Sequence, residues 1–189
     1  MKKTILFASG GGSNAQQIMN YAKQKGCYTI AAVFTNNPNA GVVEKAKSNE
    51  IPTIIFTREE LNNGWVLQKV NEINPDLIVL AGFLWKFPSS IIAAYPQKVI
   101  NIHPALLPNY GGKGMYGMHV HRAVYENREA ASGITIHYVN DNYDEGNIIL
   151  QKSVDIQECA TPEAVAQKVL ELEHEHLPKV IEELLNTKT

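Results

Sequence analysis

The sequence has 189 residues, of which 44% are hydrophobic and 19% charged, and its formal net charge is −2. These values are typical of one folded domain and argue against a disordered chain. They also lack the basic field that nucleic-acid binding requires, so we expect no nucleic-acid partner. The two cysteines, Cys27 and Cys159, match neither a zinc-site spacing nor a disulfide framework, which favours reduced thiols and no metal.

The N-terminus begins with two lysines and a short apolar run, as signal peptides do. That run ends at the glycines of residues 10–12, which is too early for the apolar region of a signal peptide. No other stretch approaches the length of a membrane-spanning helix. We therefore expect a cytoplasmic protein without a membrane partner.

The first half of the chain alternates short apolar runs with amphipathic segments. The apolar runs predict strands over residues 4–8, 29–34, 52–56, 77–81 and 98–102, and the amphipathic segments predict helices over 14–25, 42–48, 59–73 and 88–94. Strands that are apolar throughout fit a parallel sheet with helices on both faces. We therefore predict an α/β fold with a mostly parallel, twisted sheet.

The second half has a different pattern. A glycine-rich loop over 110–117 precedes a helix over 119–126, and two strands over 134–139 and 148–154 flank a polar turn. These strands predict an antiparallel hairpin at the sheet edge. A last helix is predicted to begin at Thr161-Pro162-Glu163, with the threonine as its N-cap. Without a repeat or a linker, the whole chain, residues 1–189, is expected to form a single domain.

A loop of sequence Ser-Gly-Gly-Gly-Ser-Asn, residues 9–14, connects the first strand to the first helix. Glycines let a ligand approach the backbone, and the free N–H groups at a helix start bind anions. The loop lacks the lysine of a P-loop. No acidic residue lies between Ala15 and Val43, which disfavours NAD and leaves NADP open. The loop fits either a monophosphate on a small substrate or a plain turn.

Asn101 and His103 lie at the end of the fifth predicted strand. Residues two apart in a strand point to the same side, and carboxyl ends of parallel strands bind ligands. An asparagine amide can donate to an oxyanion, and a histidine can carry a proton. A carboxylate that sets the histidine charge is expected in the polar turn, where Asp141, Asp144 and Glu145 are equal candidates.

Four segments together resemble the folate-dependent formyltransferases, in particular the phosphoribosylglycinamide formyltransferases, over essentially the whole chain. They are residues 9–14, Leu80-Ala81-Gly82-Phe83, Asn101-Ile102-His103-Pro104-Ala105-Leu106-Leu107-Pro108, and 144–151. The resemblance implies a Rossmann-like formyltransferase fold. Residues up to about 100 would form phosphate-binding βα units, and residues 101–189 would carry the catalytic and folate sites.

The resemblance also implies a reaction in purine biosynthesis. A formyl group would pass from 10-formyltetrahydrofolate to the amine of 5′-phosphoribosylglycinamide, by direct attack through a tetrahedral intermediate. Both are small-molecule substrates, no metal is needed, and the protein would be a monomer or a homodimer. Asp144 would raise the pKa of His103 and keep the ring cationic.

Site residues follow from matching this chain to the family motifs. The resemblance assigns catalysis to Asn101, His103 and Asp144, the substrate phosphate to Gly12, Ser13 and Asn14, and the acceptor to Glu173. It assigns the folate to Arg58, Leu84, Trp85, Lys86, Phe87, Asn101, Asn140, Asp141 and Asp144, with His137 as an accessory residue. The loop over 111–118 is longer than the family pattern, and the register of Arg58 is open.

Glu173 stands out independently, because it falls in the apolar stripe of the last helix, one turn from Val169 and from Leu177. A carboxylate facing inward needs a partner. The partner is either the substrate, as the resemblance implies, or a structural cation such as Arg122 or Lys113.

Three other functions compete with formyl transfer. Formyl-folate deformylases share the Asn, His and Asp set but usually carry an extra N-terminal domain, for which we expect no room before Thr4. Transfer RNA formyltransferases usually add a C-terminal barrel and a basic surface, which we do not expect here. A nucleotide-binding module without catalysis would use the glycine loop alone and leave Asn101 and His103 unexplained.

Overall fold

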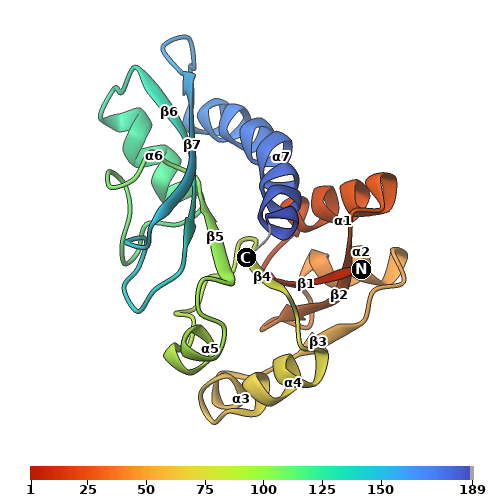
Figure 1. Ribbon diagram of the computed structural model, residues 1–189. Coiled ribbons are helices and arrows are strands. Elements are labelled where there is room, and N and C mark those ends of the chain that lie inside the picture. Colours follow the sequence, from red (N-terminus) through yellow and green to blue (C-terminus); the bar gives the residue numbers. More distant parts are fainter. Residues whose placement is uncertain (188–189) are drawn as a thin grey trace.

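The computed structural model describes residues 1–187 and is built on a seven-stranded sheet in the order β3-β2-β1-β4-β5-β6-β7 (Figure 1). The strands are β1 (Lys2–Phe7), β2 (Tyr28–Thr35), β3 (Thr53–Ile55), β4 (Leu77–Leu80), β5 (Val99–His103), β6 (Ala131–Tyr138) and β7 (Ile148–Asp155). The first five strands are parallel to one another, β6 is antiparallel to β5, and β7 is antiparallel to β6 at the edge of the sheet. The predicted α/β sheet and hairpin are confirmed.

Helices cover both faces of this sheet, as Figure 1 shows. They are α1 (Ser13–Lys25), α2 (Gly41–Ser48), α3 (Arg58–Asn62), α4 (Trp65–Ile73), α5 (Ser89–Ala94), α6 (Met118–Glu126) and α7 (Pro162–Asn186). Helices α1, α2, α6 and α7 pack into one hydrophobic cluster, and α3, α4 and α5 pack into the other. Within residues 1–187 no helix is both long and apolar enough to cross a membrane.

The single helix predicted over residues 59–73 is wrong, because the structure divides it into α3 and α4. Thr57 and Glu60 form a capping box at the start of α3. Gly64 then adopts a φ of 94°, a left-handed conformation that ends the first helix and precedes the second. The side chain of Asn63 accepts a hydrogen bond from the backbone N–H of Trp65, which restarts the helix.

Strand β5 separates apolar from polar side chains. Ile100 and Ile102 are buried in the cluster beneath α1, α6 and α7, whereas Asn101 and His103 face the other way. In the pairing with β6, Asn101 lies opposite His137. Alternation in β5 and register with β6 therefore gather three polar side chains on one face.

The loop between β6 and β7 must fold back to reach this group. Because β6 runs antiparallel to β5, it ends with Tyr138 opposite Ile100, near the start of β5. Gly146 permits the return, since a Cβ there would lie 1.7 Å from the carbonyl oxygen of Tyr138. The return path brings Asp144 back along β5 to His103.

The N-cap of α7 provides a test of how this helix is anchored. The Thr161 hydroxyl accepts a hydrogen bond from the backbone N–H of Ala164 at 3.1 Å. We predict that Thr161→Ala lowers the free energy of unfolding by about 1 kcal/mol, because the N–H loses its partner. Thr161→Ser keeps the hydroxyl and is the matched control in urea denaturation. Equal stability of the alanine and serine variants would contradict the prediction.

Candidate active site

A cavity of about 530 Å³ opens where the carboxyl ends of β4 and β5 meet the loops that follow them. Five further segments complete its wall, namely the start of α1, α6, α7, the loop after β5 and the loop after β6. Its polar lining residues include Asn14, Lys86, Asn101, His103, Lys113, His121, His137, Asn140, Asp141, Asn142, Asp144 and Glu173. Residues far apart in the sequence therefore share one enclosed volume.

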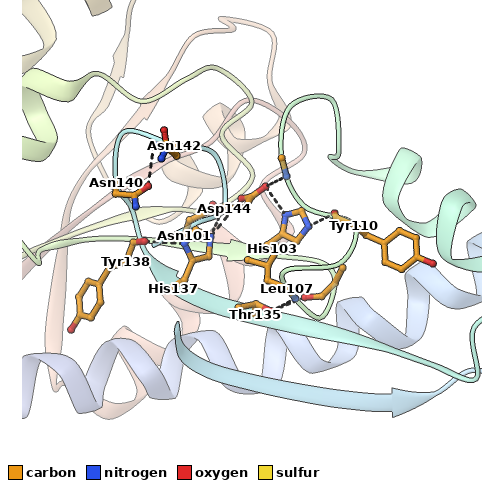
Figure 2. Close-up of polar contacts among 12 residues, drawn as sticks. Asn101, His103, Leu107, Tyr110, Thr135, His137, Tyr138, Asn140, Asn142 and Asp144 are labelled. Carbon is orange, nitrogen blue, oxygen red and sulfur yellow. Dashed lines mark hydrogen bonds and ion pairs between the residues drawn. The ribbon is translucent and has the colours of Figure 1, made fainter. Parts of the chain in front are cut away.

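The structure brings the three predicted catalytic side chains together around Asp144, as Figure 2 shows. One carboxylate oxygen, Oδ2, lies 3.5 Å from Nδ1 of His103, and the other, Oδ1, lies 3.6 Å from Nε2 of His137. The amide Nδ2 of Asn101 lies 3.1 Å from the same Nε2 of His137. The backbone N–H of Gly112 donates to Oδ2 at 2.9 Å. Asp144 thus connects both histidines and the loop after β5.

Backbone carbonyls fix which ring nitrogens carry protons. Nε2 of His103 lies 2.7 Å from the carbonyl oxygen of Tyr110, which can only accept, so this nitrogen is protonated (Figure 2). Nδ1 of His137 lies 2.9 Å from the carbonyl oxygen of Tyr138 and is protonated for the same reason. Nε2 of His137 faces both the Asn101 amide, at 3.1 Å, and the Asp144 carboxylate, at 3.6 Å, and so holds that amide in place.

Burial and charge act in opposite directions on His103 and Asp144. Burial lowers the pKa of His103 and outweighs the nearby Asp144 carboxylate and the Tyr110 carbonyl, both of which raise it. Asp144 therefore raises the pKa of His103 as expected, but desolvation is the larger effect and the net shift is downward. Burial also raises the pKa of Asp144, but the His137 hydrogen bond, the His103 charge and the Gly112 N–H together bring it below its ordinary value.

A buried threonine holds the segment that follows His103. The Thr135 hydroxyl donates to the carbonyl oxygen of Ala105 at 2.7 Å and accepts from the backbone N–H of Leu107 at 3.0 Å. The side-chain amide of Gln151 donates to the same hydroxyl and to the Leu107 carbonyl. Strands β6 and β7 therefore fix the path of the chain as it leaves β5.

One wall of the cavity is aromatic. All four residues of the predicted folate segment, 84–87, line the cavity, and Asn140 and Asp141 line it with them. Trp85 packs against Phe83 and Phe56. Arg58 is not among the lining residues, and its guanidinium carbon lies 4.7 Å from the ring centroid of Trp85. The contact of Arg58 with folate stays a prediction.

Asn14 and Glu173 form another part of the cavity lining and contact each other. The amide Nδ2 of Asn14 donates to Oε2 of Glu173 at 2.6 Å, so the partner within the described residues is neither Arg122 nor Lys113. Burial raises the pKa of Glu173 from 4.5 to about 7, although the Asn14 hydrogen bond acts to lower it. The predicted acceptor residue is therefore only partly ionised near neutral pH.

The glycine loop packs against α2. Gly12 has a φ of 69°, and a Cβ there would lie 2.7 Å from the side chain of Val42. Glycine is therefore required at this position by conformation and by space. Of the predicted phosphate residues, Asn14 lines the cavity, while Gly12 and Ser13 do not. Their contact with a phosphate stays a prediction.

Sequence reasoning did not assign four parts of this site: the Tyr110 carbonyl, the Gly112 N–H, the Thr135 hydroxyl and the His121 ring. Thr135 carried a usable signal, since it lies two residues before His137 and shares its side of a strand. Backbone groups carry no such signal, because any residue supplies them.

Comparisons with known proteins agree with this geometry. A family model described as "Formyl transferase" matches residues 2–181. A chloroplastic phosphoribosylglycinamide formyltransferase of Arabidopsis thaliana is 38% identical, over 95% of this chain and 64% of its own length. The chain thus spans less than two thirds of this plant relative.

Two bacterial proteins match over nearly their full length. A phosphoribosylglycinamide formyltransferase of Bacillus subtilis is 35% identical, over 98% of this chain and 95% of its own. A crystal structure of glycinamide ribonucleotide transformylase 1 from Geobacillus kaustophilus has a TM-score of 0.90 and 31% identity, and covers 98% of this chain and 100% of its own.

The raised pKa of Glu173 predicts how stability depends on pH. Because the folded pKa of about 7 exceeds the ordinary 4.5, the stabilising contribution is complete below pH 4.5 and is lost as pH rises through about 7. We predict a loss of roughly 3 kcal/mol over this range that Glu173→Gln lacks, since glutamine does not ionise. Urea denaturation of both proteins from about pH 5 to about pH 8 checks this. Parallel stability curves would refute it.

The Thr135 network predicts a second effect. Thr135→Val keeps the shape but leaves the Leu107 N–H, the Ala105 carbonyl and the Gln151 amide short of a partner. We predict a loss of about 2 kcal/mol in unfolding free energy, because buried groups without partners are costly. Thr135→Ser, which retains the hydroxyl, should lose much less. The idea fails if valine and serine variants unfold at the same urea concentration.

Proposed function

Since this chain belongs to the formyl transferase family, as its motifs indicated, we propose that it transfers a formyl group from 10-formyltetrahydrofolate to 5′-phosphoribosylglycinamide in purine biosynthesis. The observation that carries the proposal is the meeting of Asn101, His103 and Asp144 in one cavity whose lining also includes an aromatic wall and the Asn14–Glu173 pair. A cavity with two such different linings suits two different substrates. The names of the relatives support the same reaction.

The reaction begins when the acceptor amine attacks the formyl carbon on N10 of the folate. A C–N bond forms, the formyl oxygen takes up negative charge, and a tetrahedral intermediate results. The Asn101 amide and the protonated Nε2 of His103 donate hydrogen bonds to this oxyanion. In the resting structure this Nε2–H is donated to the Tyr110 carbonyl, so the oxyanion has to replace that carbonyl as its acceptor, whereas Nδ1 faces Asp144.

Burial of His103 serves this step. In the resting cavity a neutral ring avoids the desolvation cost of a buried charge. The oxyanion that forms beside the ring raises its pKa and so favours the cationic form. Asp144, whose pKa lies below the ordinary value, stays ionised and adds to this effect. A second proton on the ring, and with it the positive charge, is thus favoured only while the intermediate exists.

The intermediate then collapses as the bond from carbon to N10 breaks. The amine nitrogen loses one proton and N10 gains one, and either His103 or a water held by Asp144 carries it. No side chain is acylated, so transfer is direct. The products are the formylated acceptor and the deformylated folate.

The substrates occupy opposite ends in this proposal. The pterin ring lies among Leu84, Trp85, Lys86, Phe87, Asn140 and Asp141, with Arg58 at the folate tail. The acceptor phosphate lies on Gly12, Ser13 and Asn14, and Glu173 contacts the acceptor. His137 orients Asn101 as an accessory residue.

The remaining parts of the proposal concern assembly and location. We infer a monomer or homodimer, a cytoplasmic site of action, and no need for a metal, a membrane or a nucleic acid. Hydrolysis of formyl-folate is the nearest rival, because the same three side chains would polarise the formyl carbonyl toward water. The dependence of formyl release on the acceptor amine distinguishes transfer from hydrolysis.

Catalytic variants test the proposed roles. We predict that His103→Ala and Asp144→Asn each reduce kcat by about 100- to 1000-fold, because a donor to the oxyanion or its supporting charge is lost. The assay follows the deformylated folate, with and without the acceptor, and formylated phosphoribosylglycinamide when the acceptor is present. Asp155→Asn is the control, since that carboxylate lies at the far end of β7, outside the cavity lining.

Two results would contradict the assignment. Near-full activity of either catalytic variant with unchanged substrate affinity would remove its residue from the mechanism. Formyl release at the same rate without the acceptor would favour hydrolysis. Mass spectrometry should find no acylated protein during turnover.

A further inference from the structure

His121 is a buried polar side chain that the mechanism above does not use. It lies on α6, lines the cavity, and is 7% exposed. Its Nδ1 is closed off from solvent and has no hydrogen-bond partner among residues 1–187. Buried polar atoms without partners are rare in folded proteins, so this ring needs an explanation.

The surroundings of His121 fix where its proton sits. Burial lowers the pKa of the ring, and the nearby His103 lowers it further, so the ring is neutral and carries one N–H. An N–H at Nδ1 would be buried without an acceptor, which costs more than an unused lone pair there. The proton therefore sits on the other ring nitrogen, Nε2, which is not closed off from solvent. The exposed edge of the ring thus presents an N–H to the cavity.

The position of His121 indicates which substrate atom this donor meets. His103, close enough for its charge to act on His121, marks the reacting end of the cavity. Asn14 and Glu173, on α1 and α7, mark the acceptor end, and Oδ1 of Asn14 is a second buried atom without a partner. Because α6 packs directly on α7, which carries Glu173, and the pKa of His121 responds to His103, we take His121 to lie in the interval between the two ends.

The proposed acceptor has one hydrogen-bond acceptor in that interval. Its glycinamide group carries an amide carbonyl between the attacking amine and the ribose. We propose that the Nε2–H of His121 donates a hydrogen bond to this carbonyl oxygen, which makes His121 a substrate-binding residue that selects an amino amide over a simple amine. This inference rests on the proposed function.

The bond also suits the chemistry. A hydrogen bond to the carbonyl fixes the rotation of the glycinamide group and so directs the amine toward the formyl carbon. Burial lowers the pKa of the same ring and closes off its basic Nδ1, so the ring competes poorly for the proton that leaves the amine. Because the contact exists before and during the reaction, its removal affects substrate binding more than turnover.

A cycle of protein and substrate changes tests the contact. His121→Leu removes the donor, and an analogue in which a methylene replaces the carbonyl removes the acceptor. We expect either change alone to raise KM for the acceptor about 10-fold, and both together to add little more. His121→Gln, whose amide N–H extends to a similar distance, should restore part of the affinity. His176→Leu, a histidine outside the cavity lining, is the control.

The outcomes separate this inference from the proposed function. If the parent protein formylates the natural acceptor and His121→Leu leaves KM unchanged, the contact is wrong and the function stands. If His121→Leu weakens both acceptors equally, the ring has a structural role and the contact is again wrong. If the parent protein transfers no formyl group to the natural acceptor, the proposed function itself fails. A methylene analogue that binds the parent protein as well as the natural acceptor would overturn the contact without any variant.

Discussion

The position of one carboxylate, Asp144, decides the geometry of the whole site. It contacts His103 and His137 from opposite oxygens and accepts the Gly112 N–H, so three separate segments meet at a single side chain. Each segment alone is held by the sheet: β5 and β6 through their pairing, and the loop after β5 through Thr135. This single carboxylate therefore holds three segments together. A largely buried negative charge needs hydrogen-bond donors or positive charge on several sides.

Burial gives this constellation its chemical character. The same enclosure that lowers the pKa of His103 raises that of Glu173, so a base is kept neutral and an acid half protonated in one cavity. Around the reacting groups, Asp144 is therefore the main fixed charge before substrates arrive, while Lys86, Lys113 and Asp141 line other parts of the cavity. In a medium of low polarity, the charge that develops during reaction interacts strongly with the few fixed donors around it.

Much of this arrangement followed from the sequence. Alternation in β5 predicted that Asn101 and His103 share a side, and the isolated Glu173 in an apolar stripe predicted a buried carboxylate. The break at Gly64 was missed because the flanking residues keep a helical pattern through it. The downward shift of the His103 pKa could not be predicted, because burial is a sum over the whole fold, whereas a charge partner is visible as a single residue. The polar turn offered three acids, and only the family resemblance selected Asp144.

The hydrogen bond between Asn14 and Glu173 joins residues separated by 159 positions in the chain. The helix that carries Asn14 precedes the helix that carries Glu173 in the chain, so it leaves the ribosome first. The pairing of these two side chains can therefore form only after α7 has been synthesised. A nascent chain can build most of its sheet beforehand, yet this part of the cavity wall stays incomplete until α7 has docked.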